Sequence, residues 1–413
     1  MTVSGTGSYD TGRAQEEQEG NSPIDGEGMV RSRPPICIVG IGESALGLVP
    51  NSTSLSLTVQ AVSRALMDAG LTTRDIDGCL SKAPYQEPTF LFTDQLASTL
   101  GIRLRYGHDL HAGGCTPILA LAEAARAIEA DVCHTVLVAF GENWLSYNKF
   151  PQPTHGKLHW GYEDWEEPFG LVGPPAGYAL AAKRHMYRYG TTPEQLGMIA
   201  VTQRQHALLT DNAQMRKPLT LTDYLASPWI VEPFRLPDCS LVSDYGGAFI
   251  VTTSERAADL RQKPVAVLGY GESHPHRYLM QDENLTTCGA VESGPVALQM
   301  AGVSCQEIDF AELYDSFTYT VLVQLEDYGF CTKGEGGVFV ESGCISLEGT
   351  FPVNTHGGLL SQAHADGILH VTEAVKQLRG QAGARQVPNA QVGLVSGGAG
   401  VLAVHATLVL GTT

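Results

Sequence analysis

The sequence predicts an α/β fold made of two copies of one strand-helix unit, for three reasons. A chain of 413 residues exceeds the roughly 250–300 residues at which a single core stops growing, so two lobes are expected. Short apolar runs typical of strands alternate with segments of helical periodicity. Two segments of the first part of the chain also recur, in the same order, in the second part.

The first elements show the alternation. Ile36–Val39 is an apolar run suited to a strand that is buried on both faces. Leu55–Ala69 has the pattern of a helix, and Gly70 is a typical C-terminal stop. A second buried strand is expected at Val136–Ala139. This alternation predicts a mainly parallel sheet covered by helices.

The internal repeat is the strongest of the three observations. Residues 35–44 (PICIVGIGES) recur as 264–273 (PVAVLGYGES). Residues 65–77 (ALMDAGLTTRDID) are echoed by 297–309 (ALQMAGVSCQEID), with a helix, a Gly stop and the approach to a strand in each copy. Matches in the same order predict that the chain is an internal duplication.

A weaker echo relates the Gly pair at 113–114 to the pair at 357–358, each followed by a helix with a Glu-Ala step. Together the echoes predict an N-terminal half at 34–260 and a C-terminal half at 261–413. Residues 1–33 are rich in Gly, Ser, Glu and Asp and lack periodic apolar residues, which predicts a disordered acidic tail.

The first half is longer because of an excursion at about 142–240, which we expect to be an inserted loop subdomain. It contains all four tryptophans, Trp144, Trp160, Trp165 and Trp229. Long excursions are commonly lids or ligand-binding regions, but these aromatic side chains could equally pack a subdomain onto the sheet. Helices are expected within the excursion at Tyr178–Tyr189 and Pro193–Leu209.

Composition excludes several classes of function. A net charge of -18 disfavours nucleic-acid binding, which needs a surplus of Lys and Arg. The nine cysteines form no CxxC pair and no zinc-like spacing with His, which predicts reduced thiols, no metal site and a cytoplasmic location. The sequence has no apolar run of membrane-spanning length and no signal-peptide pattern.

Several motifs resemble the thiolase superfamily, specifically its sterol-carrier and lipid-transfer branch. They lie at 312–317 (ELYDSF), 329–331 (GFC), 334–337 (GEGG) and 352–361 (PVNTHGGLLS), which leads to His364. The likeness covers nearly all of the chain after the tail. It implies a thiolase-like duplicated fold with five layers, α-β-α-β-α, and a reaction beside a coenzyme A thioester.

The resemblance draws attention to Cys115, because thiolases use a cysteine at the start of a buried helix as nucleophile. Cys115 precedes a helix expected at Pro117–Ala130, whose positive end would favour the thiolate. An ungapped alignment with the family, however, places Gly114 at the nucleophile position. The alternative for Cys115 is a small buried residue without a catalytic role.

Two further residues carry over from the family pattern. His364 corresponds to the catalytic histidine and is expected to act as a base or an oxyanion donor. Tyr314 replaces the Asn or His of the oxyanion motif, as in steroid side-chain aldolases and some aromatic acyltransferases, and its phenol can donate to a developing enolate. A structural role in anchoring Phe317 is the alternative for Tyr314.

The second catalytic cysteine of thiolases is absent, since the matching turn is VSGGAG at 395–400. Its Gly397 amide is a candidate for an oxyanion hole. Gly358, Asn354 and Ser316 are further candidates for oxyanion or substrate binding. The missing cysteine places a conventional acetoacetyl-CoA thiolase cycle in doubt.

Three functions follow as hypotheses. The first is Claisen or retro-Claisen acyl transfer, with Cys115 as nucleophile and His364 and Tyr314 managing protons. The second is retro-aldol cleavage of a β-hydroxyacyl-CoA without a covalent intermediate. The third is a non-catalytic subunit that binds acyl-CoA or lipid.

No bound cofactor is expected, and the coenzyme A thioester would be the substrate. The resemblance also implies a homodimer and a small zinc-ribbon and OB-fold partner protein.

Overall fold

One antiparallel strand pair joins the two halves of the chain. A computed structural model describes residues 34–149 and 165–413; the predicted tail at 1–33 lies outside these residues. Within them, β1 (Ile36–Glu43) pairs with β8 (Val265–Ser273), with Cys37 opposite Ala266. The pairing makes one nine-stranded sheet. In spatial order its strands are β3 (Tyr106–Asp109), β2 (Gly78–Ser81), β4 (Thr135–Asn143), β7 (Asp244–Thr253), β1, β8, β11 (Val404–Thr412), β10 (Val392–Ala399) and β9 (Phe310–Glu312).

Strand directions correct one expectation, because the prediction of a mainly parallel sheet is wrong. β2 runs parallel to β3 and β4, and β9 runs parallel to β10, but the other five neighbouring pairs in the sheet are antiparallel. The cause is the last strand of each half. β7 inserts antiparallel between β1 and β4, and β11 inserts antiparallel between β8 and β10. The alternation of strands and helices in the sequence therefore predicts correctly only the parallel pairs, and it does not predict where β7 and β11 insert.

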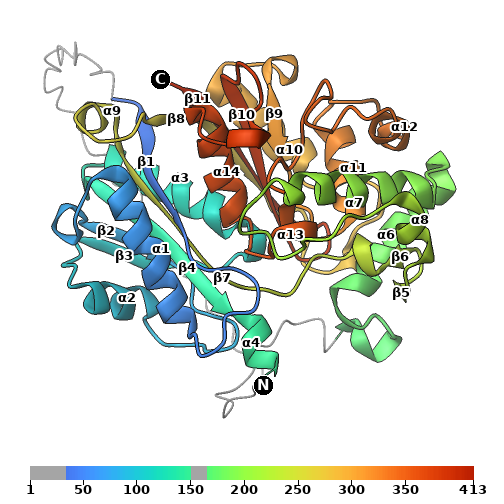
Figure 1. The fold of residues 1–413 in the computed structure, drawn as a ribbon, viewed down its shortest axis with the longest axis horizontal. Coiled ribbons are helices and arrows are strands. Elements are labelled where there is room, and N and C mark those ends of the chain that lie inside the picture. The colour runs from blue at the N-terminus through green and yellow to red at the C-terminus, as the bar shows by residue number, and fades with distance from the viewer. Residues whose placement is uncertain (1–33, 150–164) are drawn as a thin grey trace, which may run out of the picture. The chain divides into compact units, whose positions relative to one another are not determined.

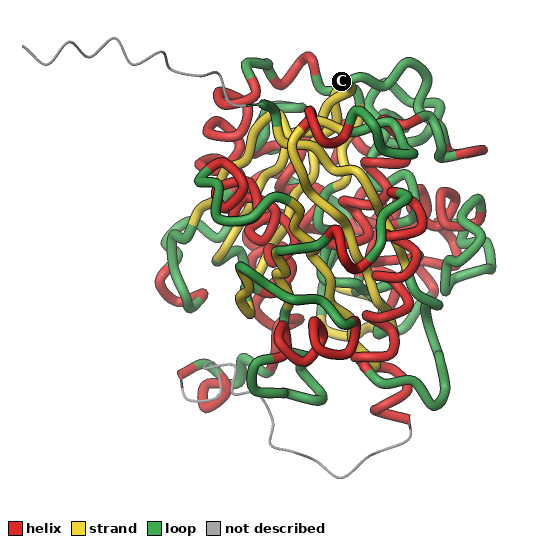
Figure 2. The backbone as a smooth tube through the Cα atoms, turned by 90° about the vertical axis from the view of Figure 1, so that its left-hand side faces the viewer, coloured by secondary structure: helices red, strands yellow, loops and turns green. Residues whose placement is uncertain are grey.

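Helices cover both faces of the strands (Figure 2). In the described residues they are α1 (Ser54–Ala69), α2 (Phe92–Leu100), α3 (Thr116–Glu129), α4 (Trp144–Lys149), α6 (Gly173–Tyr189), α7 (Pro193–Leu208), α8 (Leu221–Ala226), α9 (Ser254–Ala257), α10 (Ala290–Ala301), α11 (Thr318–Asp327), α12 (Gly336–Glu341), α13 (Gly358–Ser361) and α14 (Ile368–Arg379). α1 packs on the strands of the first half and α10 on those of the second, whereas α3 and α14 contact strands of both halves (Figure 1). The fold is therefore α/β with a large central sheet, and the five-layer description stays a prediction.

The largest buried cluster lies where the halves meet. It joins Ile118 of α3 and Phe140 of β4 to Ile368 of α14 and Leu408 of β11, all at most 2% exposed. Burial of such side chains contributes about 1.5–3 kcal/mol each. The contact between halves is thus part of the core.

The repeated Gly-x-Gly has a steric explanation. A β-carbon at Gly42 would lie 2.1 Å from the carbonyl oxygen of Ala61 in α1, and one at Gly271 would lie 2.2 Å from that of Ser293 in α10. β-carbons at Gly40 and Gly269 would lie 2.5 Å and 2.2 Å from backbone oxygens of the same two helices. Each half therefore packs its helix backbone directly onto its first strand.

The second repeated segment forms the same cap in both halves. α1 ends at Gly70 (φ 73°) and α10 at Gly302 (φ 70°), in the left-handed conformation that glycine adopts readily. A 3₁₀ turn follows in each half. The sheet order β1, β7, β4, β2 has a counterpart in β8, β11, β10, β9. This arrangement is what a duplication would produce, although the duplication itself stays a prediction.

The excursion between β4 and β7 is largely helical in its described part. α6 and α7 lie at the predicted positions, and α8 and a hairpin of β5 (Trp229–Val231) with β6 (Phe234–Arg235) follow. α7 contacts α11, α12 and α13, so this segment covers the second half. Trp160 and the rest of 150–164 lie outside the described residues. Among the helices that the structure describes, none combines the length and apolarity needed to cross a membrane.

The glycine contacts generate a stability prediction. We expect Gly271→Ala to lower the free energy of unfolding by about 2–3 kcal/mol, because the added methyl group overlaps the Ser293 carbonyl and forces α10 off β8. The measurement is urea denaturation followed by circular dichroism. The neighbouring exposed Glu272 provides the control, since Glu272→Ala should change stability by at most about 0.5 kcal/mol. Equal midpoints for both variants would contradict the steric explanation.

Candidate active site

Tyr314 follows β9 in a turn whose backbone is held from two sides. Its N–H donates to Ser396 Oγ in β10 at 2.8 Å. Its carbonyl accepts from Thr320 Oγ1 at 3.0 Å and from Gln324 Nε2 at 2.9 Å, both in α11. Ser396 in turn donates to Gln324 Oε1. The main chain therefore has little freedom, which is what a precisely placed phenol requires.

The two motifs that carry the strongest resemblance bind each other. Asn354 Oδ1 accepts from Leu313 N at 2.6 Å, and Asn354 Nδ2 donates to Leu313 O at 2.9 Å. Glu312 Oε1 accepts from Thr355 Oγ1 at 2.8 Å, and Glu312 Oε2 lies 2.8 Å from His356 Nδ1. Asn354 is fully buried. Its side chain therefore fixes the backbone at Leu313, directly before Tyr314.

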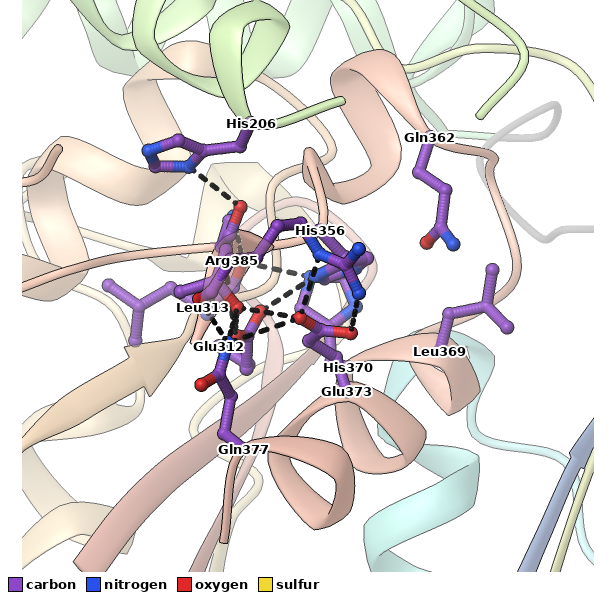
Figure 3. A network of polar contacts seen from close by, with 12 residues as sticks. His206, Glu312, Leu313, His356, Gln362, Leu369, His370, Glu373, Gln377 and Arg385 are labelled. Carbon is purple, nitrogen blue, oxygen red and sulfur yellow. Dashed lines mark hydrogen bonds and ion pairs between the residues drawn. The ribbon is translucent and has the colours of Figure 1, made fainter. Parts of the chain in front are cut away.

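A buried cluster of charged residues surrounds the 354–356 segment (Figure 3). Glu373 in α14 accepts from Thr355 Oγ1 at 2.9 Å and pairs with Arg385 Nη2 at 2.9 Å. Burial by itself would lower the pKa of His356, but the carboxylates of Glu312 and Glu373 raise it above its usual value. Charged groups of both signs thus hold the 354–356 segment against β9 and α14.

Asp315 anchors the other side of the turn. Its carboxylate accepts from Leu359 N at 2.9 Å and Leu360 N at 3.1 Å, and lies 3.1 Å from His370 Nε2. A β-carbon at Gly358 would lie 2.1 Å from Asp315 Oδ2, so the α13 backbone approaches this carboxylate closely. Gly358 therefore serves the packing of the turn.

The Tyr314 ring lies in a slot made of glycines. A β-carbon at Gly114 would lie 2.1 Å from Tyr314 Cε2 and 2.5 Å from its Oη. β-carbons at Gly398 and Gly367 would lie 3.1 Å from Cδ1 and 3.5 Å from Cδ2 of the same ring. At Gly114 no side chain fits unless the ring moves. The phenol thus occupies the space where a side chain at position 114 would lie.

The environment keeps the Tyr314 phenol protonated. Burial, and then the negative charge of Asp366, raise its pKa well above the usual value. A small cavity of about 20 Å³ borders the ring, lined also by Tyr178, Gln324 and His405, which is room for about one water. Tyr314 therefore stays protonated and can donate a hydrogen bond.

Cys115 lies beside the slot but faces the core. It is 0% exposed, and its Sγ contacts the Val404 carbonyl at 3.5 Å. Burial raises the pKa of its thiol well above the usual value. The expectation that the start of α3 would lower this pKa is wrong, because desolvation of the thiolate outweighs the helix end.

His364 lies in the loop before α14, and its side chain is 22% exposed. Its Nδ1 lies 3.0 Å from Ser240 Oγ and its Nε2 lies 3.5 Å from Asp366 Oδ1. Its backbone N–H donates to Ser243 Oγ at 3.0 Å. Asp366 is followed by Gly367, where a β-carbon would lie 3.5 Å from Cδ2 of the Tyr314 ring. The structure thus brings Tyr314, His364 and the Gly114–Cys115 turn to one region of the seam between the halves.

The remaining predicted residues lie around this region. Gly397 pairs with Ala406 between β10 and β11, and a β-carbon there would lie 2.6 Å from the Gly114 carbonyl oxygen. The Ser316 carbonyl accepts from Ser240 N at 2.9 Å, which ties it to the residue that contacts His364. Roles for Gly397 and Ser316 in substrate binding stay predictions.

Sequence reasoning missed Lys82, Glu142 and Asp366, which form a buried ion cluster next to His364. The only local signal was a charged residue directly after a buried strand, at 82 after β2, and another within β4 at 142. Neither indicates its partner, because Lys82 and Asp366 lie 284 positions apart.

Comparisons with known proteins agree with this architecture. The family model described as "Thiolase C-terminal domain-like" matches residues 271–412. A 17-hydroxy-3-oxo-4-pregnene-20-carboxyl-CoA lyase from Mycobacterium tuberculosis is 34% identical, over 88% of this chain and 96% of the relative. The solved structure named "Ltp2-ChsH2(DUF35) aldolase" matches with a TM-score of 0.83 at 31% identity, covering 92% of this chain and 98% of that chain.

The chain belongs to the thiolase superfamily. Within the superfamily it falls in the sterol-carrier branch. An acetyl-CoA acetyltransferase from Methanothermobacter thermautotrophicus is 30% identical over 90% of this chain and 98% of the relative. The relatives of this thiolase-superfamily chain thus include both lyases and acyltransferases, and the choice between the two reactions depends on the site.

The burial of Cys115 predicts its reactivity. We expect iodoacetamide at pH 8 to leave Cys115 unlabelled in the folded protein while it labels the partly exposed Cys344, because only an accessible thiolate reacts. Peptide mass spectrometry measures the two rates, and labelling in urea shows that both peptides are detectable. Comparable rates for the two thiols in the folded protein would contradict the described placement.

Proposed function

We propose that this chain is a retro-aldol lyase that cleaves a β-hydroxyacyl-CoA into a carbonyl compound and a shorter acyl-CoA. The observation that carries the proposal is the contact between Gly114 and Tyr314. The position that aligns with the thiolase nucleophile has no side chain, and the phenol fills the space of one. A retro-aldol cleavage needs a base and an acid but no nucleophile.

The site residues supply those two groups. His364 takes the proton from the β-hydroxyl group, the bond between the α and β carbons breaks, and the electrons pass to the thioester as an enolate. The β carbon becomes a ketone or aldehyde. The Tyr314 phenol, whose raised pKa keeps it protonated, donates its proton to the α carbon and later regains one from His364. Protons and electrons balance without an added reactant.

Acyl transfer, the first hypothesis from the sequence, is the competing function. It requires a thiolate that can reach the substrate. Cys115 is fully buried and faces a core carbonyl. The lyase relative and the aldolase structure support the retro-aldol alternative, while the acetyltransferase relative keeps acyl transfer as an outcome to be tested.

We further propose that the chain works with a small partner protein. The support is the name of the solved aldolase, which pairs Ltp2 with the DUF35 part of ChsH2. Coenzyme A thioesters as substrates, a homodimer and a zinc-ribbon or OB-fold character of the partner follow from the family resemblance alone.

The proposed function is tested with a panel of β-hydroxyacyl-CoA esters and Tyr314→Phe. We expect the wild type to release a ketone or aldehyde together with the shortened acyl-CoA. Tyr314→Phe should lower kcat by about 100-fold or more, since loss of a positioned acid or oxyanion donor costs that much. Liquid chromatography with mass spectrometry quantifies both products.

Cys115→Ala separates the two functions. Retro-aldol chemistry predicts kcat within about twofold of the wild type once the folded fraction is matched, because the thiol does not contact the reacting atoms. A covalent acyl adduct on Cys115 after incubation with acyl-CoA, together with loss of turnover in Cys115→Ala, would instead establish acyl transfer.

A further inference from the structure

Lys82 directly follows β2 and places a fully buried ammonium group between two carboxylates. Its Nζ lies 2.9 Å from Glu142 Oε1 in β4 and 2.5 Å from Asp366 Oδ2 in the turn before α14. The side chains of Lys82 and Glu142 are 0% exposed. Buried ions are retained only where close geometry and further hydrogen bonds offset their desolvation. Here the backbone N–H of Tyr85 supplies such bonds to Glu142, at 2.9 and 3.1 Å.

The two oxygens of Asp366 face different groups. Oδ2 accepts from Lys82 Nζ and from the Tyr245 hydroxyl, which lies 3.0 Å away. Oδ1 lies 3.5 Å from His364 Nε2. Because Oδ2 is engaged by two donors, the orientation of the carboxylate is fixed and Oδ1 is left for the imidazole.

Asp366 keeps its charge in this position. Burial by itself would raise the pKa of its carboxyl, but the charge of Lys82 and the hydrogen bond from Lys82 bring that pKa well below its usual range. Burial raises the pKa of Glu142 despite the same lysine. Asp366 is therefore the more firmly ionised of the two partners of Lys82.

A carboxylate can only accept hydrogen bonds, so it selects the imidazole tautomer that carries its proton on the facing nitrogen. For His364 that nitrogen is Nε2. Nδ1 then has a lone pair and accepts from Ser240 Oγ at 3.0 Å. A substrate hydroxyl that displaces Ser240 Oγ would meet the same lone pair.

We propose that Lys82 and Asp366 are positioning residues that hold the proton of His364 on Nε2 and make Nδ1 the atom that accepts the β-hydroxyl proton. The inference rests on the proposed retro-aldol function for its catalytic consequence. With neutral His364, the ions Glu142, Lys82 and Asp366 carry one net negative charge. When Nδ1 gains a proton the cluster becomes neutral, so the lysine and carboxylates stay paired throughout the step.

Asp366→Asn tests the tautomer directly. Lys82 and Tyr245 both donate to the Oδ2 side, so the asparagine must place its oxygen there and turn its NH₂ group toward His364. Nε2 would then become the acceptor, and the proton would move to Nδ1. Asparagine also tolerates the left-handed backbone at this position (φ 44°).

Nitrogen-15 NMR of histidine-labelled protein identifies the tautomer, and His364→Gln assigns the signal. We expect Nε2–H in the wild type and Nδ1–H in Asp366→Asn. In that variant kcat should fall by about 100-fold or more with KM within about threefold, because a wrongly placed proton removes the base, as when the triad carboxylate of serine proteases is replaced by an amide.

A matched control is available in Asp327, whose buried carboxylate also lies 2.5 Å from a lysine, Lys333. Asp327→Asn should leave the His364 tautomer unchanged, so any shared loss of stability is accounted for. The pair Lys82→Met with Glu142→Gln removes one charge of each sign. Asp366 then keeps only the Tyr245 hydroxyl as a donor to Oδ2, so its carboxylate is free to rotate. We expect His364 to be a mixture of tautomers and kcat to fall by about tenfold.

An unchanged Nε2–H signal in Asp366→Asn and in the Lys82/Glu142 double variant would overturn the inference, whatever the activities. Failure of the proposed function has a different signature. In that case the wild type would release no carbonyl product from any β-hydroxyacyl-CoA, while the tautomer would still change as described.

Discussion

The contact between the Tyr314 ring and the Gly114 backbone limits what the site can do. A β-carbon at Gly114 would overlap the ring, and Gly367 and Gly398 line its other sides. A residue with a nucleophilic side chain at position 114 is incompatible with the phenol in its place. The phenol therefore occupies the space that a side chain at position 114 would need.

The contact depends on how the halves are joined. Gly114 belongs to the first half, whereas Tyr314, Gly367 and Gly398 belong to the second. The pairing of β1 with β8 and the shared core around α3 and α14 hold these segments in one place. That core is continuous across the seam. Movement between the halves would therefore expose buried apolar side chains and would also separate the residues of the site.

Buried charges hold the loops that carry the side chains. Glu312, His356 and Glu373 fix the Tyr314 turn from behind. Lys82 and Asp366 fix the histidine loop from the side of the first half. Loops bear reactive groups well only when such networks order them. The two networks differ in what they hold, since the first fixes the turn that carries Tyr314 and the second contacts the His364 side chain.

The sequence by itself determined the elements with local causes. The Gly-x-Gly strands and the glycine caps recur because helix backbones pack against those positions in each half, and the motifs around Tyr314 and His364 are short enough to recognise. Tertiary structure decided the rest. β7 inserts antiparallel beside β4 only after the long excursion that follows β4, burial of Cys115 outweighs the helix end, and Lys82 meets Asp366 across the seam. These outcomes depend on desolvation and on contacts between distant segments, for which neighbouring residues carry no signal.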